Sequence, residues 1–267
     1  MGRGMYTWFW WVRVAISNPI REVWAKERTA FGLWLAIPDS FSAEIMAGAN
    51  VDYVCVDQQH GAVDYTSMVP MLQAIGAAGA APITRVLSND PYQIMRSLDA
   101  GALGVIVPLV NNAEEAARAV AACHYPPHGI RSYGPIRAAG VIGSRDPDDL
   151  AREVLCIVMV ETLEGLEKVE EIAATPGVDG IYIGPADLAL SLGLPPTTEI
   201  VEDAHVEAVR KIREACKEHG IASGMHAASG EWARKHAEAG FDMVTVAADA
   251  SLLKDAARRE VAAARGE

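Results

Sequence analysis

Residues 155–190 read LCIVMVETLEGLEKVEEIAATPGVDGIYIGPADLAL, and this stretch decides the fold. It holds two short apolar runs, Leu155–Val160 and Gly180–Ile183, on either side of a helix-like segment, Leu163–Ala174. Both runs are continuously apolar rather than alternating, as expected for parallel strands that are buried on both faces. The stretch therefore predicts a strand–helix–strand unit with a right-handed crossover.

The same unit recurs along the chain. Eight strand candidates can be read, at Phe31–Ile37, Tyr53–Asp57, Pro82–Val86, Gly104–Pro108, Leu155–Val160, Gly180–Ile183, Ile221–Met225 and Met243–Val246. Helical segments lie between them, at Ala43–Ala49, Tyr65–Ala78, Pro91–Ala100, Ala113–Ala122, Leu163–Ala174, Ala204–His219 and Gly230–Ala239. This alternation predicts an α/β fold, a (β/α)8 TIM barrel. An open doubly wound sheet is the alternative, but no G-x-G-x-x-G follows the first strand.

The chain is predicted to form one domain. Its 267 residues are an ordinary length for a barrel, and no Pro/Gly/Ser-rich linker interrupts them. We assign residues 19–267 to a single catalytic barrel, preceded by a helix at Pro19–Lys26. Residues 1–18 are interpreted as an N-terminal extension that packs on the body or is disordered. Its apolar run, Tyr6–Ile16, is shorter than the ~20 residues of a membrane span, and no signal-peptide cleavage site follows it.

Composition excludes several classes of partner. The chain is 51% hydrophobic and 22% charged, as in a soluble globular protein, and its formal net charge is −12. A phosphate backbone is bound by positive surfaces, so we expect no nucleic-acid partner, and we expect no membrane partner either. The four cysteines lack C-x-x-C spacing. We interpret them as reduced thiols of a cytoplasmic protein.

Polar residues follow several of the predicted strands. The second strand runs into Asp57-Gln58-Gln59-His60-Gly61, the third delivers Arg85, the fifth ends at Glu161, and the sixth runs into Gly184-Pro185-Ala186-Asp187. Barrel active sites form at these carboxyl ends. Two carboxylates, an arginine and a histidine are what enolate chemistry requires. Carboxylate oxygens suit magnesium or manganese, and the metal and the arginine would stabilise negative charge on a keto oxygen.

Each of these residues also has a purely structural interpretation. Asp187 can cap the helix that follows it, and Glu161 can pair with Lys168. Arg85 can form an ion pair with Asp90, and His60 can be a histidine of a turn. The functional hypothesis depends on all four residues meeting at one end of the barrel.

Several motifs in this order resemble the HpcH/HpaI family of class II, metal-dependent pyruvate aldolases. The matching segments are Gly32-Leu33-Trp34, Asp57-x-x-His60-Gly61, Arg85, Leu98-Asp99-x-Gly101-Ala102, Tyr125-Pro126-Pro127-x-Gly129-x-Arg131, Val160-Glu161 and Ile183-Gly184-Pro185-Ala186-Asp187-Leu188. Their order and spacing hold from about residue 30 to residue 250. The last two segments are distinctive, so the combined match is specific although either motif alone is weak.

The resemblance implies a role for each position of the donor site. Glu161 and Asp187 would bind a divalent metal, Mg²⁺, Mn²⁺ or Co²⁺. Arg85 would contact the keto oxygen of pyruvate, and the backbone of Gly184-Pro185-Ala186 its carboxylate. Trp34 would pack against the donor pocket.

The resemblance also implies the proton-transfer chemistry. His60, paired with Asp99 of a neighbouring subunit, would act as the acid and base through a water on the metal. In the cleavage direction the base takes the C4 hydroxyl proton of a 4-hydroxy-2-oxo acid. The C3–C4 bond then breaks, which releases an aldehyde and leaves the enolate of pyruvate. No lysine lies at a strand end, so no Schiff base is expected.

Three departures from the family pattern stand near the expected site. Gln59 replaces the glutamate that many members carry before the histidine, and Met159 replaces a frequent glutamine. Both positions are expected beside the metal and its waters. The loop after Arg131 reads Ser132-Tyr133-Gly134 rather than Gly-x-Gly. We expect that loop to face the aldehyde, so the identity of the aldehyde cannot be carried over from the family.

Two other functions are alternatives to an aldolase. One is a lyase that uses the same enolate on an acyl-CoA or citryl-type substrate, but no basic cluster for the CoA phosphates is evident. The other is a non-catalytic barrel scaffold, which predicts lesions among the metal ligands or the base, and none is present. The sequence leaves open whether the donor is pyruvate or hydroxypyruvate. The resemblance favours a homohexamer with C-terminal helices exchanged between subunits.

Overall fold

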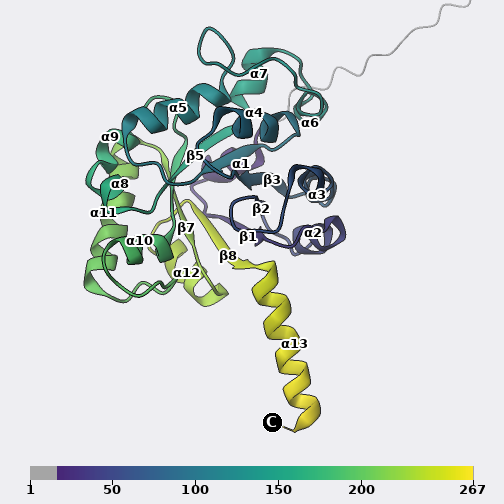
Figure 1. Cartoon of the computed structure of the whole chain (residues 1–267), viewed down its shortest axis with the longest axis vertical. Helices are drawn as coiled ribbons and strands as arrows, with labels where there is room; N and C mark the ends of the chain where they lie inside the picture. The colour runs from purple at the N-terminus through teal and green to yellow at the C-terminus, as the bar shows by residue number, and fades with distance from the viewer. Residues whose placement is uncertain (1–16, 267) are drawn as a thin grey trace, which may run out of the picture.

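The chain closes into a barrel of parallel strands. The structure, a computed structural model, describes residues 17–266. The strands are β1 (Ala30–Leu35), β2 (Tyr53–Asp57), β3 (Ala81–Arg85), β4 (Gly104–Val107), β5 (Leu155–Val160), β6 (Gly180–Ile183), β7 (Ala222–His226) and β8 (Met243–Ala248). Each pairs in parallel with its neighbours in chain order, and β8 closes against β1. The predicted (β/α)8 barrel is confirmed, and the open sheet is excluded (Figure 1).

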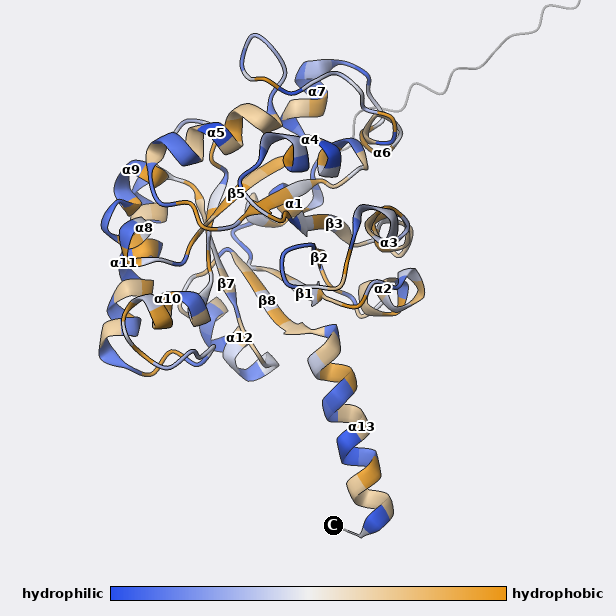
Figure 2. Ribbon diagram, viewed as in Figure 1, coloured by the Kyte–Doolittle hydropathy of each residue, from blue (hydrophilic) through white to orange (hydrophobic). Residues whose placement is uncertain are grey.

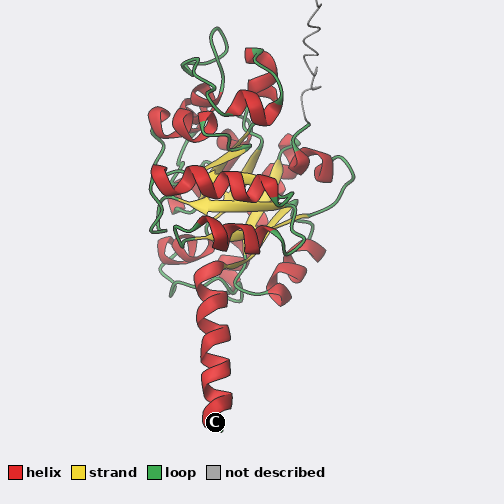
Figure 3. Ribbon diagram, turned by 90° about the vertical axis from the view of Figure 1, so that its right-hand side faces the viewer, coloured by secondary structure: helices red, strands yellow, loops and turns green. Residues whose placement is uncertain are grey.

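Helices surround the barrel and connect its strands (Figure 3). They are α1 (Pro19–Trp24), α2 (Ser40–Ala47), α3 (Tyr65–Ala77), α4 (Pro91–Asp99), α5 (Ala113–Cys123), α6 (Ala138–Ile142), α7 (Pro147–Arg152), α8 (Leu163–Glu167), α9 (Val169–Ala173), α10 (Pro185–Ser191), α11 (Asp203–His219), α12 (Gly230–Glu238) and α13 (Asp249–Arg265). Their ends follow local chemistry. Asp64 and Ser67 form a capping box at the start of α3, and Gly220 ends α11 with a φ of 66°.

The barrel interior is filled by side chains from alternate positions of the strands. Tyr53 and Tyr182 are fully buried there. A Cβ at Gly32 would overlap the Tyr53 ring, and a Cβ at Gly224 would overlap the Tyr182 ring. Glycine on β1 and β7 therefore makes room for the two aromatic side chains. Figure 2 shows hydrophobic residues along the strands of the barrel.

Four features of the outer layer differ from the sequence-based expectation. The predicted helix Leu163–Ala174 is two helices, α8 and α9, divided at Lys168, whose φ of −103° and ψ of 16° are not helical. Helices α6 and α7, within and after the segment 125–143, have no counterpart among the helical segments read from the sequence. Helix α10 begins directly after β6. The expectation for the N-terminal extension concerns mainly residues 1–16, which lie outside the described residues.

The last helix, α13, points away from the barrel (Figures 1 and 3). It is exposed along most of its length, including the apolar side chains of Leu252, Leu253 and Val261. Its first residue, Asp249, is buried and accepts hydrogen bonds from the amides of Ala36 and Ile37 at 2.9 and 3.1 Å. Within residues 17–266, no helix is both long enough and apolar enough to cross a membrane.

Candidate active site

A cavity of about 310 Å³ opens at the carboxyl ends of the strands. Its lining contains nine of the residues proposed from the sequence: Trp34, His60, Arg85, Met159, Glu161, Gly184, Pro185, Ala186 and Asp187. It also contains Asp57, Tyr182 and His226, to which no role was assigned. The barrel topology therefore brings together most of the residues that the strand-end argument selected.

Glu161 follows β5 and is almost fully buried in this cavity. One of its oxygens, Oε1, accepts the amide of Leu109 at 2.9 Å. A Cβ at Gly184 would overlap the other oxygen, so glycine at this position is required for the carboxylate to fit. Burial raises the pKa of Glu161 to about 7, and the negative charge of Asp187 adds to this effect. Glu161 does not pair with Lys168, which binds Glu164 instead.

Asp187 is exposed and occupies the third position of α10. Gly184 is the N-cap of that helix, so the interpretation of Asp187 as an N-cap is wrong. Across residues 17–266 the structure has no cluster of three or more His, Cys, Asp or Glu side chains arranged to hold a metal. The donor set is the pair of carboxylates Glu161 and Asp187, because Arg85 binds the third carboxylate of the cavity, Asp57. It fits a hard divalent cation whose other positions are taken by water and substrate.

Arg85 ends β3 and lies directly beside Asp57, its register partner at the end of β2. Its Nε donates to Asp57 Oδ1 at 2.8 Å and its Nη2 donates to Oδ2 at 2.6 Å. Burial alone would raise the pKa of Asp57, but the bonds and charge of Arg85 hold it below its usual value. The alternative pairing with Asp90 is wrong, because Asp90 caps α4.

Trp34, the next-to-last residue of β1, forms one wall of the cavity. The Arg85 guanidinium lies 5.0 Å from the centre of its indole ring, and the Tyr182 ring stacks on it at 5.7 Å. Tyr182 and Tyr53 are both within hydrogen-bonding distance of Thr245 Oγ1, at 2.6 and 2.8 Å. These contacts fix Trp34 and the floor of the cavity.

Asp57, Tyr182 and His226 are cavity residues for which the sequence predicted no role. A signal existed for each, because each is a polar side chain at or next to the carboxyl end of a predicted strand. Asp57 belongs to the motif Asp57-x-x-His60-Gly61, but the motif by itself predicted no role for it. Tyr182 was read as an apolar strand residue, and His226 stood one residue beyond the predicted end of its strand.

His60 and Met159 border the cavity, whereas Gln59 does not. His60 is exposed at the rim, and its side chain forms no hydrogen bond with any residue of the described chain. Met159 is buried in β5, so this part of the wall is apolar. Gln59 lies next to the rim, and its buried Oε1 has no hydrogen-bond partner among the described residues.

Asp99 and Arg131 lie apart from the cavity. Arg131 is almost completely buried and its Nη2 donates to Asp99 Oδ1 at 2.8 Å. Its guanidinium also lies 4.7 Å from the ring centre of Tyr125. Within one chain, Asp99 therefore binds Arg131 and not His60, and Arg131 does not face the cavity.

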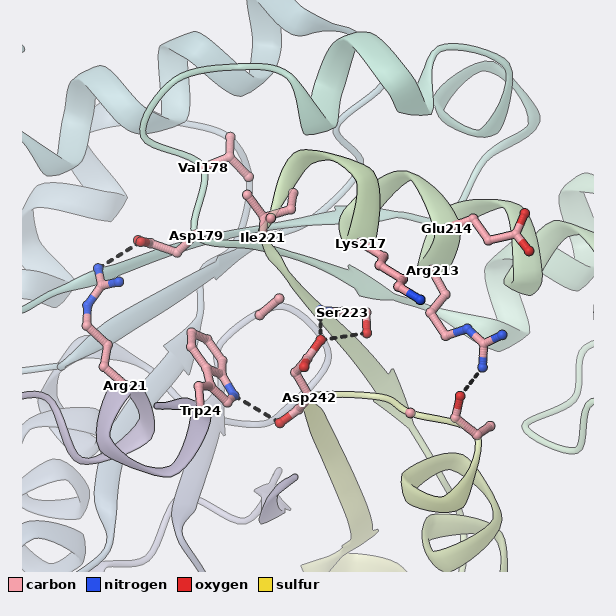
Figure 4. Close-up of a pocket in the computed structure, with 14 residues that line it drawn as sticks. Arg21, Trp24, Val178, Asp179, Arg213, Glu214, Lys217, Ile221, Ser223 and Asp242 are labelled. Carbon is pink, nitrogen blue, oxygen red and sulfur yellow. Dashed lines mark hydrogen bonds and ion pairs between the residues drawn. The ribbon is translucent and has the colours of Figure 1, made fainter. Parts of the chain in front are cut away.

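A second cavity, of about 750 Å³, lies at the amino-terminal ends of β6, β7 and β8 (Figure 4). Several of its charged groups bind one another or the backbone. Arg21 donates to Asp179 at 2.7 Å, and Asp242 Oδ2 accepts the Ser223 hydroxyl at 2.9 Å. The indole of Trp24 donates to the Asp242 carbonyl at 2.9 Å. The contacts of Arg21 and Trp24 join α1 to the barrel. This end of a barrel typically serves stability rather than catalysis.

Comparisons with known proteins agree with this geometry. The family profile described as HpcH/HpaI aldolase/citrate lyase matches residues 30–256. This chain belongs to that family. A hydroxypyruvate/pyruvate aldolase of Rhizorhabdus wittichii is 41% identical over 93% of this chain and 99% of its own. A 4-hydroxy-2-oxo-heptane-1,7-dioate aldolase of Klebsiella pneumoniae is 38% identical over 89% and 90%.

A solved structure supports the same family membership. A HpcH/HpaI aldolase/citrate lyase family protein of Burkholderia cenocepacia superposes with a TM-score of 0.86 at 35% identity, covering 93% of this chain and 100% of its own. The resemblance expected from the motifs is confirmed. The chain is an aldolase, a carbon–carbon lyase, and the lyase of acyl-CoA or citryl substrates and the inert scaffold are not favoured.

Proposed function

We propose that this aldolase reversibly cleaves a 4-hydroxy-2-oxo acid to an aldehyde and pyruvate or hydroxypyruvate. The observation that carries the proposal is the shared cavity, in which Glu161, Asp187, Arg85 and His60 all meet. The names of the relatives support the substrate class, since both act on 2-oxo acids.

Arg85 has one nitrogen available for the keto oxygen. Asp57 takes Nε and Nη2, whereas Nη1 forms no hydrogen bond within the described chain. A guanidinium held in this way presents its third nitrogen without having to reorganise, which favours charge that develops on a substrate oxygen. The amide of Ala186, in the first turn of α10, would meet the carboxylate, as anions bind well at helix starts.

Glu161 and Asp187 would hold Mg²⁺, Mn²⁺ or Co²⁺. When bound, the metal acts as a Lewis acid toward the keto group. The described lining of the cavity contains no lysine, which supports chemistry without a Schiff base.

His60 at the rim is the proposed base. In cleavage it takes the proton of the C4 hydroxyl, and the C3–C4 bond breaks as the C4 oxygen becomes the aldehyde. The bonding electrons pass to C3, where a proton is added after the aldehyde leaves. Asp99 of a neighbouring subunit would orient His60. Gln59 and Met159 would alter the surroundings of the metal. Arg131 would hold the loop that faces the aldehyde.

The proposed reaction can be tested directly. A panel of 4-hydroxy-2-oxo acids would be offered to the protein, with pyruvate release coupled to a dehydrogenase. We expect cleavage of at least one member with equal release of aldehyde and pyruvate. If no member of the panel is cleaved with excess Mg²⁺, Mn²⁺ or Co²⁺ present, the proposal is rejected.

We propose further that the chain forms a homohexamer in the cytoplasm. The exposed α13, with Leu252 and Leu253 on its surface, supports an exchange of this helix between subunits. The four cysteines are free and buried, which supports a reducing compartment.

A further inference from the structure

His226, the last residue of β7, forms part of the cavity wall that the proposed mechanism leaves unused. Its imidazole meets Trp34 edge-on, with ring centres 5.1 Å apart and planes at 89°. Trp34 also contacts Arg85, at 5.0 Å. His226 and Arg85 therefore border the same part of the cavity, joined by one indole ring.

The hydrogen bonds around His226 determine which nitrogen faces the substrate. The Tyr182 hydroxyl donates its hydrogen to Thr245 Oγ1 at 2.6 Å. The Tyr182 oxygen can then only accept from His226 Nδ1, which lies at 3.4 Å. This arrangement places the imidazole hydrogen on Nδ1 and leaves the Nε2 lone pair free.

Nε2 has no partner among the described residues and is not enclosed by them. Burial lowers the pKa of His226 to about 4, and the positive charge of Arg85 contributes to the shift. The ring is therefore neutral near pH 7. It is suited to accept a hydrogen bond rather than to act as an acid.

We propose that His226 binds a hydroxyl group on C3 of the donor, so that the enzyme recognises 3-hydroxy-2-oxo acids such as hydroxypyruvate. This inference rests on the proposed function, in which Arg85 holds the keto oxygen one carbon away from C3. A C3 hydroxyl can donate to Nε2, whereas the methyl group of pyruvate leaves that nitrogen without a partner. The hydroxyl also suits either tautomer, since it both donates and accepts.

The test measures donor activation without an aldehyde. The enzyme is incubated with pyruvate or hydroxypyruvate in D₂O with excess Mn²⁺. The Mn²⁺ is then removed, and the exchange of the C3 hydrogens for deuterium is measured by NMR. The variants are His226→Phe, which keeps a planar ring, His226→Gln, which keeps a polar atom, and Tyr182→Phe, which removes the orienting hydroxyl. His219→Phe on exposed α11 is the matched control.

We expect the wild type to exchange both donors. The ratio of the hydroxypyruvate rate to the pyruvate rate should fall about threefold to tenfold in His226→Phe, the effect of one hydrogen bond. It should fall less in His226→Gln and Tyr182→Phe, and stay constant in His219→Phe. A constant ratio in His226→Phe, or a wild type that exchanges pyruvate alone, overturns the inference and leaves the proposed function intact. A wild type that exchanges neither donor and cleaves no substrate overturns both.

Discussion

Arg85 depends on Asp57 for its orientation, because two of its nitrogens bind the two oxygens of that carboxylate. A lysine in its place keeps the charge but cannot form this paired contact while also addressing a substrate. We therefore expect Arg85→Lys to be nearly as damaging as Arg85→Ala. Loss of one donor to a developing oxyanion costs about 2.7–4 kcal/mol, or roughly 10²–10³ in rate.

The kcat and KM of both variants in the cleavage assay check this expectation. Arg96→Lys provides a matched control, since Arg96 lies on α4 over the ring of Tyr65 and outside the cavity. Retention of half the wild-type rate by Arg85→Lys would show that Arg85 serves only as a structural partner of Asp57.

Glu161 links pH to stability in the metal-free protein. Its pKa is raised to about 7, chiefly by burial, so the folded chain holds this proton more tightly than the unfolded chain. The stability from the protonated carboxyl is fully present below about pH 4.5 and is lost as pH rises through about 7. The shift corresponds to roughly 3 kcal/mol.

We expect Glu161→Gln, which cannot ionise, to remove this pH dependence. Thermal unfolding of both metal-free proteins would be compared from pH 5 to pH 8. The wild type should lose stability relative to Glu161→Gln as pH rises, and a divalent metal should restore it. Parallel Tm profiles for the two proteins would refute the assignment of a raised pKa.

Beyond its first residue, helix α13 is largely exposed in the part of the chain that the structure describes. Leu253 is 64% exposed on it, and the neighbouring Lys254 is exposed as well. If α13 packs on another subunit, a charge at Leu253 must be buried at the interface. We expect Leu253→Asp to yield a smaller species than the wild type by size-exclusion chromatography with light scattering. Lys254→Asp should not, and identical masses for all three proteins would exclude α13 from the interface.

The elements themselves were largely predictable from the sequence. Every strand was located to within two residues, because strands buried on both faces form uninterrupted apolar runs. The break between α8 and α9 was not predicted, since the residues on both sides of Lys168 continue the helical pattern. Only the backbone angles of Lys168 reveal it.

Part of the site was predictable from the sequence, namely the charged residues at or near the ends of predicted strands. Glu161 was found because it directly follows an apolar run, and Arg85 because it is a charged residue near the end of a predicted strand. Tyr182 was missed because it stands within an apolar run, and His226 because it follows the predicted end of its strand. The pairing of Asp99 with Arg131 spans 32 positions and has no local signal.

On the scale of the whole molecule, the described lining of the cavity contains no lysine, and it contains two carboxylates, Glu161 and Asp187, besides Asp57, which Arg85 binds. We therefore expect strict metal dependence. Dialysis against EDTA should abolish turnover, and Mg²⁺, Mn²⁺ or Co²⁺ should restore it, with bound metal counted by elemental analysis. Full turnover by a preparation free of metal, or trapping of substrate by borohydride, would contradict the assignment.

The tether at Asp249 has a kinetic consequence. Asp249 binds the amides of Ala36 and Ile37, while Ala36 and Ala248 both line the cavity. The start of α13 is thus part of the cavity wall. If α13 packs on another subunit, as proposed, release of the helix by a departing subunit should loosen that wall. Specific activity should then fall when the enzyme is diluted, with a lag that reflects subunit exchange, and return on concentration. Progress curves across a dilution series would show this for the wild type, whereas Leu253→Asp should give the same specific activity at every dilution.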